Sequence, residues 1–227
     1  MGSLGEELVK TLDNGTAFTI PIGNGLPVSQ SVVVTWCIMA FLVVISIIFT
    51  RNLKLVPKGP QLYVEALVGF INSFFGDLLG KEGKKFVPYL GTVLIYLACA
   101  NVIGIFGITP PTKDLNVTAA LALMSIVLIE FGGLFAKGFK GWVKSFSEPI
   151  AIVAPINILE IFIRPLSLCM RLFGNILGGF IVMELIKIVV PLFVPLPFSF
   201  YFDVFDGLIQ AYIFVFLTSL FLKEAIE

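Results

Sequence analysis

The stretch QSVVVTWCIMAFLVVISIIFT, residues 30–50, decides the fold class of this chain. It carries no charged residue, and a helix needs about 20 apolar residues to cross a bilayer. Inside a bilayer every backbone polar group must be hydrogen-bonded within the protein, which a helix achieves. We therefore predict a transmembrane helix over residues 30–50.

The segment before this helix is mixed in character and contains Glu6, Glu7, Lys10 and Asp13. A secretory signal would begin with a basic region and end at a cleavage site. We therefore expect the first helix to be retained. This predicts an extracytoplasmic N-terminal segment over residues 1–28 and a single integral membrane domain over residues 29–227.

The composition indicates a membrane protein throughout. The chain is 58% hydrophobic and only 13% charged, whereas a soluble protein is about half apolar and about a quarter charged. Fifteen basic residues balance 15 acidic ones, so charge gives no reason to expect a nucleic-acid partner. Cys37, Cys99 and Cys169 lie in apolar runs without metal-ligand spacing. We predict neither a metal site nor a cofactor.

Further apolar runs predict the rest of the membrane domain. Residues 61–80 follow a Gly-Pro break and mix Glu65, Asn72 and Asp77 with apolar residues, which favours an amphipathic helix lying in the membrane interface. Four more membrane crossings are predicted, over residues 86–109, 116–136, about 149–190, and 198–222. The predicted fold class is an all-α polytopic membrane protein with about five crossing helices and one interfacial helix. The last two crossings are long and tilted.

Basic residues predict the orientation. Nine of them cluster after residue 50, around residues 81–85 and after residue 136, whereas Lys10 and Lys113 fall on the other side. Lysine and arginine are enriched in cytoplasmic loops. The amino terminus is therefore expected outside and the carboxyl terminus in the cytoplasm.

Arg171 is the most costly charge in the predicted membrane domain. A charge at membrane depth costs about 2.5–3.5 kcal/mol on insertion scales, so it is kept when something uses it. Asn175 lies one helical turn further on nearly the same face, and Gly178 adds a small residue beside it. A structural ion pair within the bundle is the alternative reading of Arg171.

Other charged residues in the last two crossings suggest a polar route. Glu160 is placed to pair with Arg164 at a spacing of four residues. Glu184 is predicted on the opposite side of the helix from Arg171, where it could line an aqueous path or pair with Lys187.

Asp203, Asp206 and Gln210 are spaced to form one polar stripe on an otherwise apolar helix. Carboxylates at such spacing suit proton or ion relay, although Asp203 could instead reach the outer headgroups. Glu130 has no partner evident in the sequence.

Three separated motifs resemble subunit a of F-type ATP synthases. They are PPTKDLNVTAALAL at 110–123, RPLSLCMRLFGNILGG at 164–179 and LIQAYIFVFLT at 208–218. The resemblance implies that Arg171 is the essential stator arginine, with Asn175 beside it and Gln210 facing it from the last helix. Where the family often has an acid or histidine, this chain has Phe180. Glu184 and Asp203 are the candidate replacements in the ion path.

The resemblance also implies the function. The chain would provide two ion half-channels to a rotating ring of c subunits and so couple H⁺ or Na⁺ translocation to ATP synthesis. The implied partners are the c ring, the b-subunit peripheral stalk, the other synthase subunits and the lipid bilayer of a bacterial plasma membrane. No phosphate-binding loop is present, so the chain would not be an enzyme by itself.

Two other functions remain possible from the residues. A stand-alone secondary transporter would use Arg171 to bind an anionic substrate, but no internal repeat of the kind common in transporters is evident. A purely structural membrane anchor would need Arg171 for no function at all.

Overall fold

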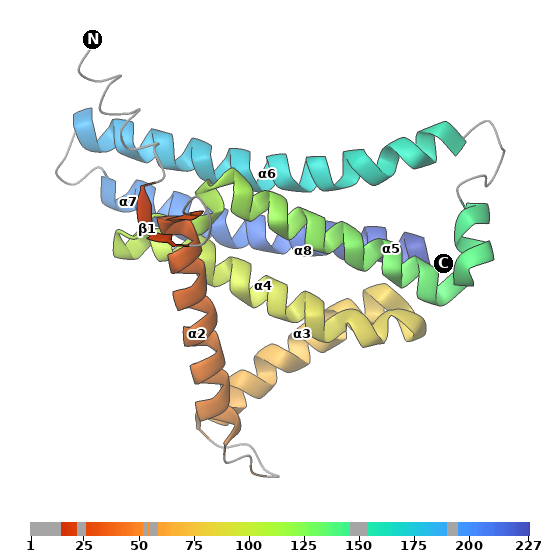
Figure 1. Ribbon diagram of the computed structural model, residues 1–227. Coiled ribbons are helices and arrows are strands. Elements are labelled where there is room, and N and C mark those ends of the chain that lie inside the picture. Colours follow the sequence, from red (N-terminus) through yellow and green to blue (C-terminus); the bar gives the residue numbers. More distant parts are fainter. Residues whose placement is uncertain (1–14, 22–25, 52–53, 55–58, 146–153, 190–194) are drawn as a thin grey trace.

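The structure is a computed structural model that describes residues 15–21, 26–51, 54, 59–145, 154–189 and 195–227 (Figure 1). Five helices in this part of the chain are long and apolar enough to cross a membrane. The prediction of an all-α polytopic membrane protein is therefore confirmed.

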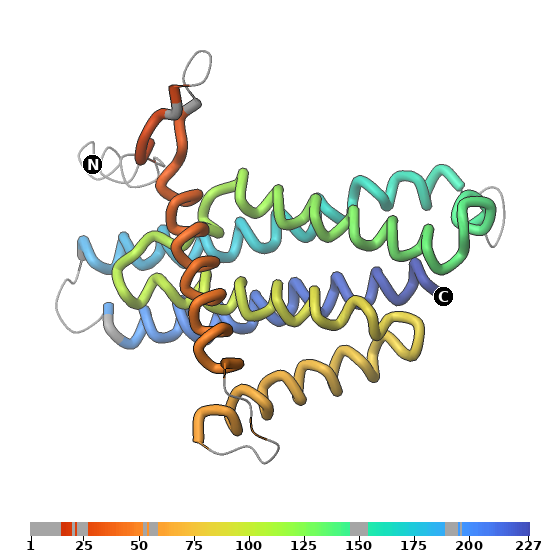
Figure 2. The backbone as a smooth tube through the Cα atoms, turned by 60° about the horizontal axis from the view of Figure 1, so that its bottom comes forward, coloured from red at the N-terminus to blue at the C-terminus, as the bar shows by residue number. Residues whose placement is uncertain are grey.

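Helix α2, Gln30–Thr50, has the bounds that its uncharged sequence predicts. Only Ser31 and Ile38 on it are buried, so nearly all of its apolar side chains are available to lipid. Figure 2 shows α2 crossing the group formed by the other long helices. A two-stranded antiparallel sheet of β1, Thr16–Ile20, and β2, Leu26–Ser29, precedes it. We did not predict this hairpin.

Helix α3, Pro60–Gly83, corresponds to the predicted amphipathic helix and packs against α4 and α8. Its backbone breaks at Gly80, where φ is 66°, a conformation that glycine adopts without a steric penalty. Its position at a membrane interface stays a prediction. A 3₁₀ turn, η1 (Lys84–Phe86), leads into α4, Val87–Val102.

The predicted crossing over 86–109 is shorter as an α-helix than expected. After α4 the chain tightens into a 3₁₀ turn, η2 (Ile103–Phe106), and leaves it at Gly107, where φ is 72°. A second turn, η3 (Pro111–Lys113), precedes α5, Leu115–Ser145. Helix α5 breaks at Gly138, where φ is 69°.

The last two predicted crossings are the long helices α6 and α8, which run antiparallel (Figure 1). Helix α6 spans Ala154–Val189. The final segment begins earlier than predicted, as the short α7, Pro195–Ser199, and continues through a π-helix, η5 (Phe200–Asp206), into α8, Gly207–Ile226. The start of the predicted crossing over 149–190 lies outside the described residues.

The core lies among α3, α4, α5, α6 and α8. Its most buried side chains are apolar: Phe75, Leu90, Leu97, Ile129, Leu168, Leu172, Phe214, Val215 and Leu222. Burying such side chains gives each helix one inner face. The outer faces keep large exposed apolar side chains, as a lipid-embedded protein requires.

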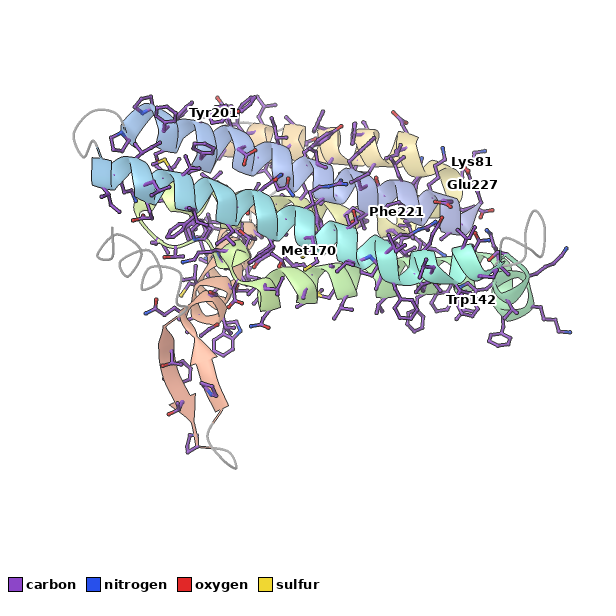
Figure 3. All side chains as sticks on the ribbon, turned by 90° about the horizontal axis from the view of Figure 1, so that it is seen from above. Lys81, Trp142, Met170, Tyr201, Phe221 and Glu227 are labelled. Atoms are coloured by element: carbon purple, nitrogen blue, oxygen red, sulfur yellow. The ribbon has the colours of Figure 1, made fainter. Side chains whose placement is uncertain are left out.

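The group of long helices has two distinct ends. The turn from α3 to α4, the end of α5, the start of α6 and the end of α8 lie together (Figure 1). Figure 3 labels Lys81, Trp142 and Glu227 at this end and Tyr201 at the other. We name the first the basic end after its lysines: Lys81, Lys84, Lys85, Lys137, Lys140, Lys144 and Lys223. The opposite end, with the α4–α5 connection and α7, is the far end.

Candidate functional site

Arg171 lies on the exposed side of α6, about 100° around the helix from the stripe of side chains that α6 buries. Leu168, Leu172 and Ile176 recur every four residues and are buried in the core. This spacing forms a single stripe, which α6 turns toward α5. Arg171 is exposed, and it forms no ion pair or hydrogen bond with any residue that the structure describes.

The surface beside Arg171 is built from small residues. Gly174, Asn175 and Gly178 follow it at the spacing of one helix face, and all three are exposed. A Cβ atom added at Gly174 or Gly178 would meet nothing within 4 Å. Small residues allow another helix to approach closely. The small residues beside the guanidinium therefore leave open space on this face of α6.

Asn175 and Gln210 are in direct contact across α6 and α8. The Asn175 Nδ2 donates a hydrogen bond of 2.8 Å to the Gln210 Oε1. Gln210 is 1% exposed, and its Nε2 is buried without a hydrogen-bond partner in the described part of the chain. Gln210, which was expected to face Arg171, is hydrogen-bonded to Asn175, one helical turn along α6 from Arg171.

A cavity of about 400 Å³ lies at the far end, between α6, the π-helix η5 and the segment that follows α4. Glu184 and Asp203 both line it, together with Phe180 and Lys187. The Lys187 Nζ lies 2.8 Å from the Glu184 Oε1, which is the pair that the sequence allowed. The structure therefore places the two proposed replacement acids in one cavity.

The π-helix η5 brings Asp203 against the chain after α4. A Cβ atom on Gly104 would lie 2.6 Å from the Asp203 Oδ1, so a larger residue there would displace the carboxylate. The Ser199 Oγ donates a hydrogen bond of 2.5 Å to the Asp203 Oδ2. The single polar stripe predicted for this helix is interrupted by η5. Asp206 is half-buried and lies outside the lining of the cavity, whereas Gln210 is fully buried.

Lys113 lies behind the cavity and was expected in an exposed outer loop. It is only 5% exposed, and its Nζ lies 4.0 Å from the centre of the Phe180 ring. Burial lowers the pKa of the Lys113 ammonium, while Glu184 and Asp114 act to raise it. No sequence signal indicated this burial, because it depends on the packing of η3 against α6.

Asn101 was not identified from the sequence as a site residue, yet it joins three segments at the far end. It is 1% exposed, donates a 2.9 Å hydrogen bond to the Gly207 carbonyl and accepts one of 2.9 Å from the Thr112 hydroxyl. Buried polar groups with satisfied partners fix a unique arrangement. Asn101 therefore links the first residue of α8 to α4 and to η3. An uncompensated amide inside an apolar run was the signal that could have found it.

The structure gives the interaction partners of two charged residues, Arg164 and Glu130. Arg164 contacts Glu160 as its spacing predicts, and it also reaches Glu224 on α8. Glu130 has a partner after all, since the Trp142 Nε1 donates a 3.0 Å hydrogen bond to its Oε2. The chain turns at Gly138 between them.

These features define a multi-pass helical membrane protein that exposes an arginine among small residues, next to a pair of hydrogen-bonded amides and without a partner in the described part of the chain. Residues 32–223 match the family model described as ATP synthase A chain. The chain therefore belongs to the ATP synthase subunit a family, whose members are non-catalytic membrane subunits of that complex.

Three curated relatives agree with this membership. ATP synthase subunit a, sodium ion specific, of Propionigenium modestum is 33% identical over 89% of this chain and 75% of its own length. ATP synthase subunit a 2 of a Bradyrhizobium species is 37% identical over 88% of this chain and 89% of its own. ATP synthase subunit a of Moorella thermoacetica is 33% identical over 89% of this chain and 93% of its own.

Proposed function

We propose that this chain is the stator channel subunit of an F-type ATP synthase and that Arg171 is its essential residue. In this role the chain presents two ion half-channels to a rotating ring of c subunits. Each ion binds a ring carboxylate, travels with the ring and leaves on the other side of the membrane. Translocation is thereby coupled to ATP synthesis, which other subunits catalyse.

The exposed and unpaired state of Arg171 is the observation that carries this proposal. An arginine at membrane depth costs about 2.5–3.5 kcal/mol on insertion scales. No described residue of this chain compensates Arg171, and the glycines beside it leave room for a second helix. A carboxylate supplied by a close-packed partner helix meets both conditions.

The chemistry of a guanidinium suits the stator role. It does not lose its proton in proteins, so it holds an arriving carboxylate in the ionised form. The same fixed positive charge repels cations and prevents them from passing directly between the half-channels. The Asn175–Gln210 pair, one turn away, adds a fixed polar contact on the same helix pair.

The cavity at the far end supports one of the two half-channels. Glu184 and Asp203 line this cavity and supply the carboxylates that Phe180 cannot provide. One charge that crosses 100 mV releases about 2.3 kcal/mol. The free energies of several such crossings together supply the synthesis of one ATP. The coupling ion is H⁺ or Na⁺, and one relative is named sodium ion specific.

The remaining parts of the proposal concern location and partners. The chain spans the plasma membrane of a bacterium, with the amino terminus outside and the basic end in the cytoplasm, as the lysine distribution favours. It assembles with the c ring, the b-subunit peripheral stalk and the other synthase subunits. A cysteine at Glu227 should then react with an impermeant maleimide only when the cytoplasmic face is accessible.

Replacing Arg171 with alanine in the assembled synthase tests the function. Coupled ATP synthesis should disappear while ATP hydrolysis by the soluble sector continues. Arg51→Ala is the matched control, since Arg51 is an exposed arginine at the end of α2, and it should leave synthesis intact. Full synthesis by the Arg171→Ala complex would refute the proposal. Uptake of an anionic substrate by vesicles that contain only this chain would indicate a transporter, which no observation here favours.

A further inference from the structure

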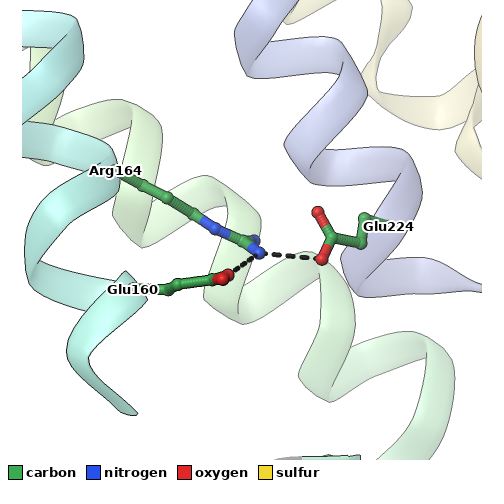
Figure 4. A network of polar contacts seen from close by, with 3 residues as sticks. All are labelled: Glu160, Arg164 and Glu224. Carbon is green, nitrogen blue, oxygen red and sulfur yellow. Dashed lines mark hydrogen bonds and ion pairs between the residues drawn. The ribbon is translucent and has the colours of Figure 1, made fainter. Parts of the chain in front are cut away.

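Arg164 forms a cluster that joins α6 to α8 at the basic end (Figure 4). Its Nη2 lies 2.5 Å from the Glu160 Oε2 on the same helix and 2.8 Å from the Glu224 Oε1 on α8. Its guanidinium carbon also lies 5.0 Å from the centre of the Phe221 ring on α8. The Arg164 side chain is only 17% exposed, so it is held between the two helices.

This cluster is in register with the Asn175–Gln210 contact. Residues 164 and 175 are 11 apart on α6, and residues 210 and 221 are 11 apart on the antiparallel α8. Eleven residues are close to three full helical turns, or about 16 Å at 1.5 Å per residue. The two contacts therefore lie on one face of each helix. Arg171 lies in the interval between them.

Few other contacts join the two helices directly. Both pack against α5, and near the far end Gly179 lies against Phe202 of η5. Between Arg164 and Asn175, α6 turns Leu166, Met170 and Arg171 outward. The distance from α6 to α8 along the exposed face thus depends on the polar contact at each side of Arg171.

We propose that Arg164 is a positioning residue that fixes α8 against α6 at the basic end, so that the Asn175–Gln210 pair stays in place beside Arg171. The proposal rests on the stator function proposed above. A stator must hold its polar contacts still while a partner moves past, and two contacts three turns apart prevent one helix from pivoting on the other.

The contact to Glu160 alone does not serve this purpose, because both residues belong to α6. Glu224 is itself 63% exposed, so its contact with Arg164 also adds little stability and its role is to set the position of α8. The contacts to Glu224 and Phe221 cross to α8. The planar guanidinium can bond a carboxylate and cover an aromatic ring at the same time, which a lysine ammonium does less well.

The test uses the assembled synthase reconstituted in vesicles. Glu224→Gln removes the charge of the contact to α8 and keeps its shape, and Arg164→Gln removes the whole cluster. Glu227→Gln is the matched control, because Glu227 is three residues away on the same helix end and pairs only along α8, with Lys223 at 3.6 Å. The readouts are the amount of subunit a in the complex, the leak of the coupling ion, and ATP made per ion translocated.

We expect Glu224→Gln and Arg164→Gln to lower ATP made per ion by about threefold or more and to raise the leak, in complexes that assemble normally. The double variant should be no worse than Arg164→Gln alone, since both changes break one contact. Arg164→Lys should restore part of the coupling, and Glu227→Gln should equal the parent. If Arg164 were needed only for folding, replacing it would reduce the amount of complex and leave the ATP made per translocated ion unchanged.

If assembled Glu224→Gln complexes make as much ATP per translocated ion as the parent, the proposal is wrong. This holds even if the Arg164→Gln variant fails to assemble. That result leaves the stator function standing. The stator function fails separately, if the Arg171→Ala complex remains coupled.

Discussion

The Nδ2 of Asn175 donates a hydrogen bond to the Oε1 of Gln210 at 2.8 Å, while the Nε2 of Gln210 is buried without a partner in the described residues. A buried donor left unsatisfied costs about 1–3 kcal/mol. The pair is therefore costly for the isolated chain. Such a cost is typical of a functional contact that a partner or a water molecule completes.

Replacing Gln210 with leucine should lower the activity of the complex without lowering its stability. Leucine removes the unsatisfied donor and fills similar space, so we expect the thermal midpoint of the complex to stay within about 2 °C of the parent or to rise. Coupled ATP synthesis should nevertheless fall severalfold, because the contact beside Arg171 is lost. If ATP synthesis falls only as much as the amount of assembled complex falls, Gln210 is a packing residue.

Replacing Gly178 with leucine should block the approach of a partner helix. No atom of this chain lies within 4 Å of an added Cβ there, so the chain itself should fold normally. Overpacking in an interface costs about 1–3 kcal/mol, and we expect synthesis to drop by about tenfold. Gly69 on α3 is equally open, and Gly69→Leu serves as the control. Equal effects of the two substitutions would argue against a docking groove at Gly178.

Glu184→Gln and Asp203→Asn test the cavity at the far end as an ion path. Each substitution keeps the shape of the side chain and removes the group that exchanges a proton or binds a cation. We expect passive ion flux through the membrane sector to slow by about tenfold or more in at least one of them. Asp77→Asn, on the exposed side of α3, should leave the flux unchanged. If neither cavity variant slows the flux, the ions take another route.

Trp142→Phe should destabilise the basic end without affecting ion flux in complexes that remain assembled. The phenyl ring keeps most of the apolar surface and loses the indole N–H that bonds Glu130. Losing the donor to a half-buried carboxylate should cost about 1–3 kcal/mol, measured from thermal unfolding. Trp36→Phe on α2, where the ring is 49% exposed, should cost much less. A similar cost for both would mean that the bond to Glu130 contributes nothing measurable.

Local features of the helices followed from the sequence. Residues 30–50 form a helix with the predicted bounds, because an uncharged apolar run of this length has one structure that satisfies its backbone in lipid. The Glu160–Arg164 and Glu184–Lys187 pairs were also predictable, since residues three or four apart on a helix are neighbours whatever surrounds them.

Features that depend on several segments were not predictable. The π-helix η5 interrupts the regular spacing from which one stripe of Asp203, Asp206 and Gln210 was predicted. The partner of Glu130 lies beyond the break at Gly138. The burial of Lys113 depends on α6, which comes later in the chain. No periodicity within one segment carries information of this kind.

The sequence by itself determined that this chain crosses a membrane and that Arg171 is the charge requiring an explanation, because a charge deep in a long apolar helix is costly and rare. The tertiary structure decided that Arg171 is unpaired and exposed, that Asn175 meets Gln210, and that Glu184 and Asp203 share a cavity. These facts depend on how α6 lies against α8 and η5. That arrangement depends on packing between segments far apart in the chain, as in the core shared by α3, α4, α5, α6 and α8.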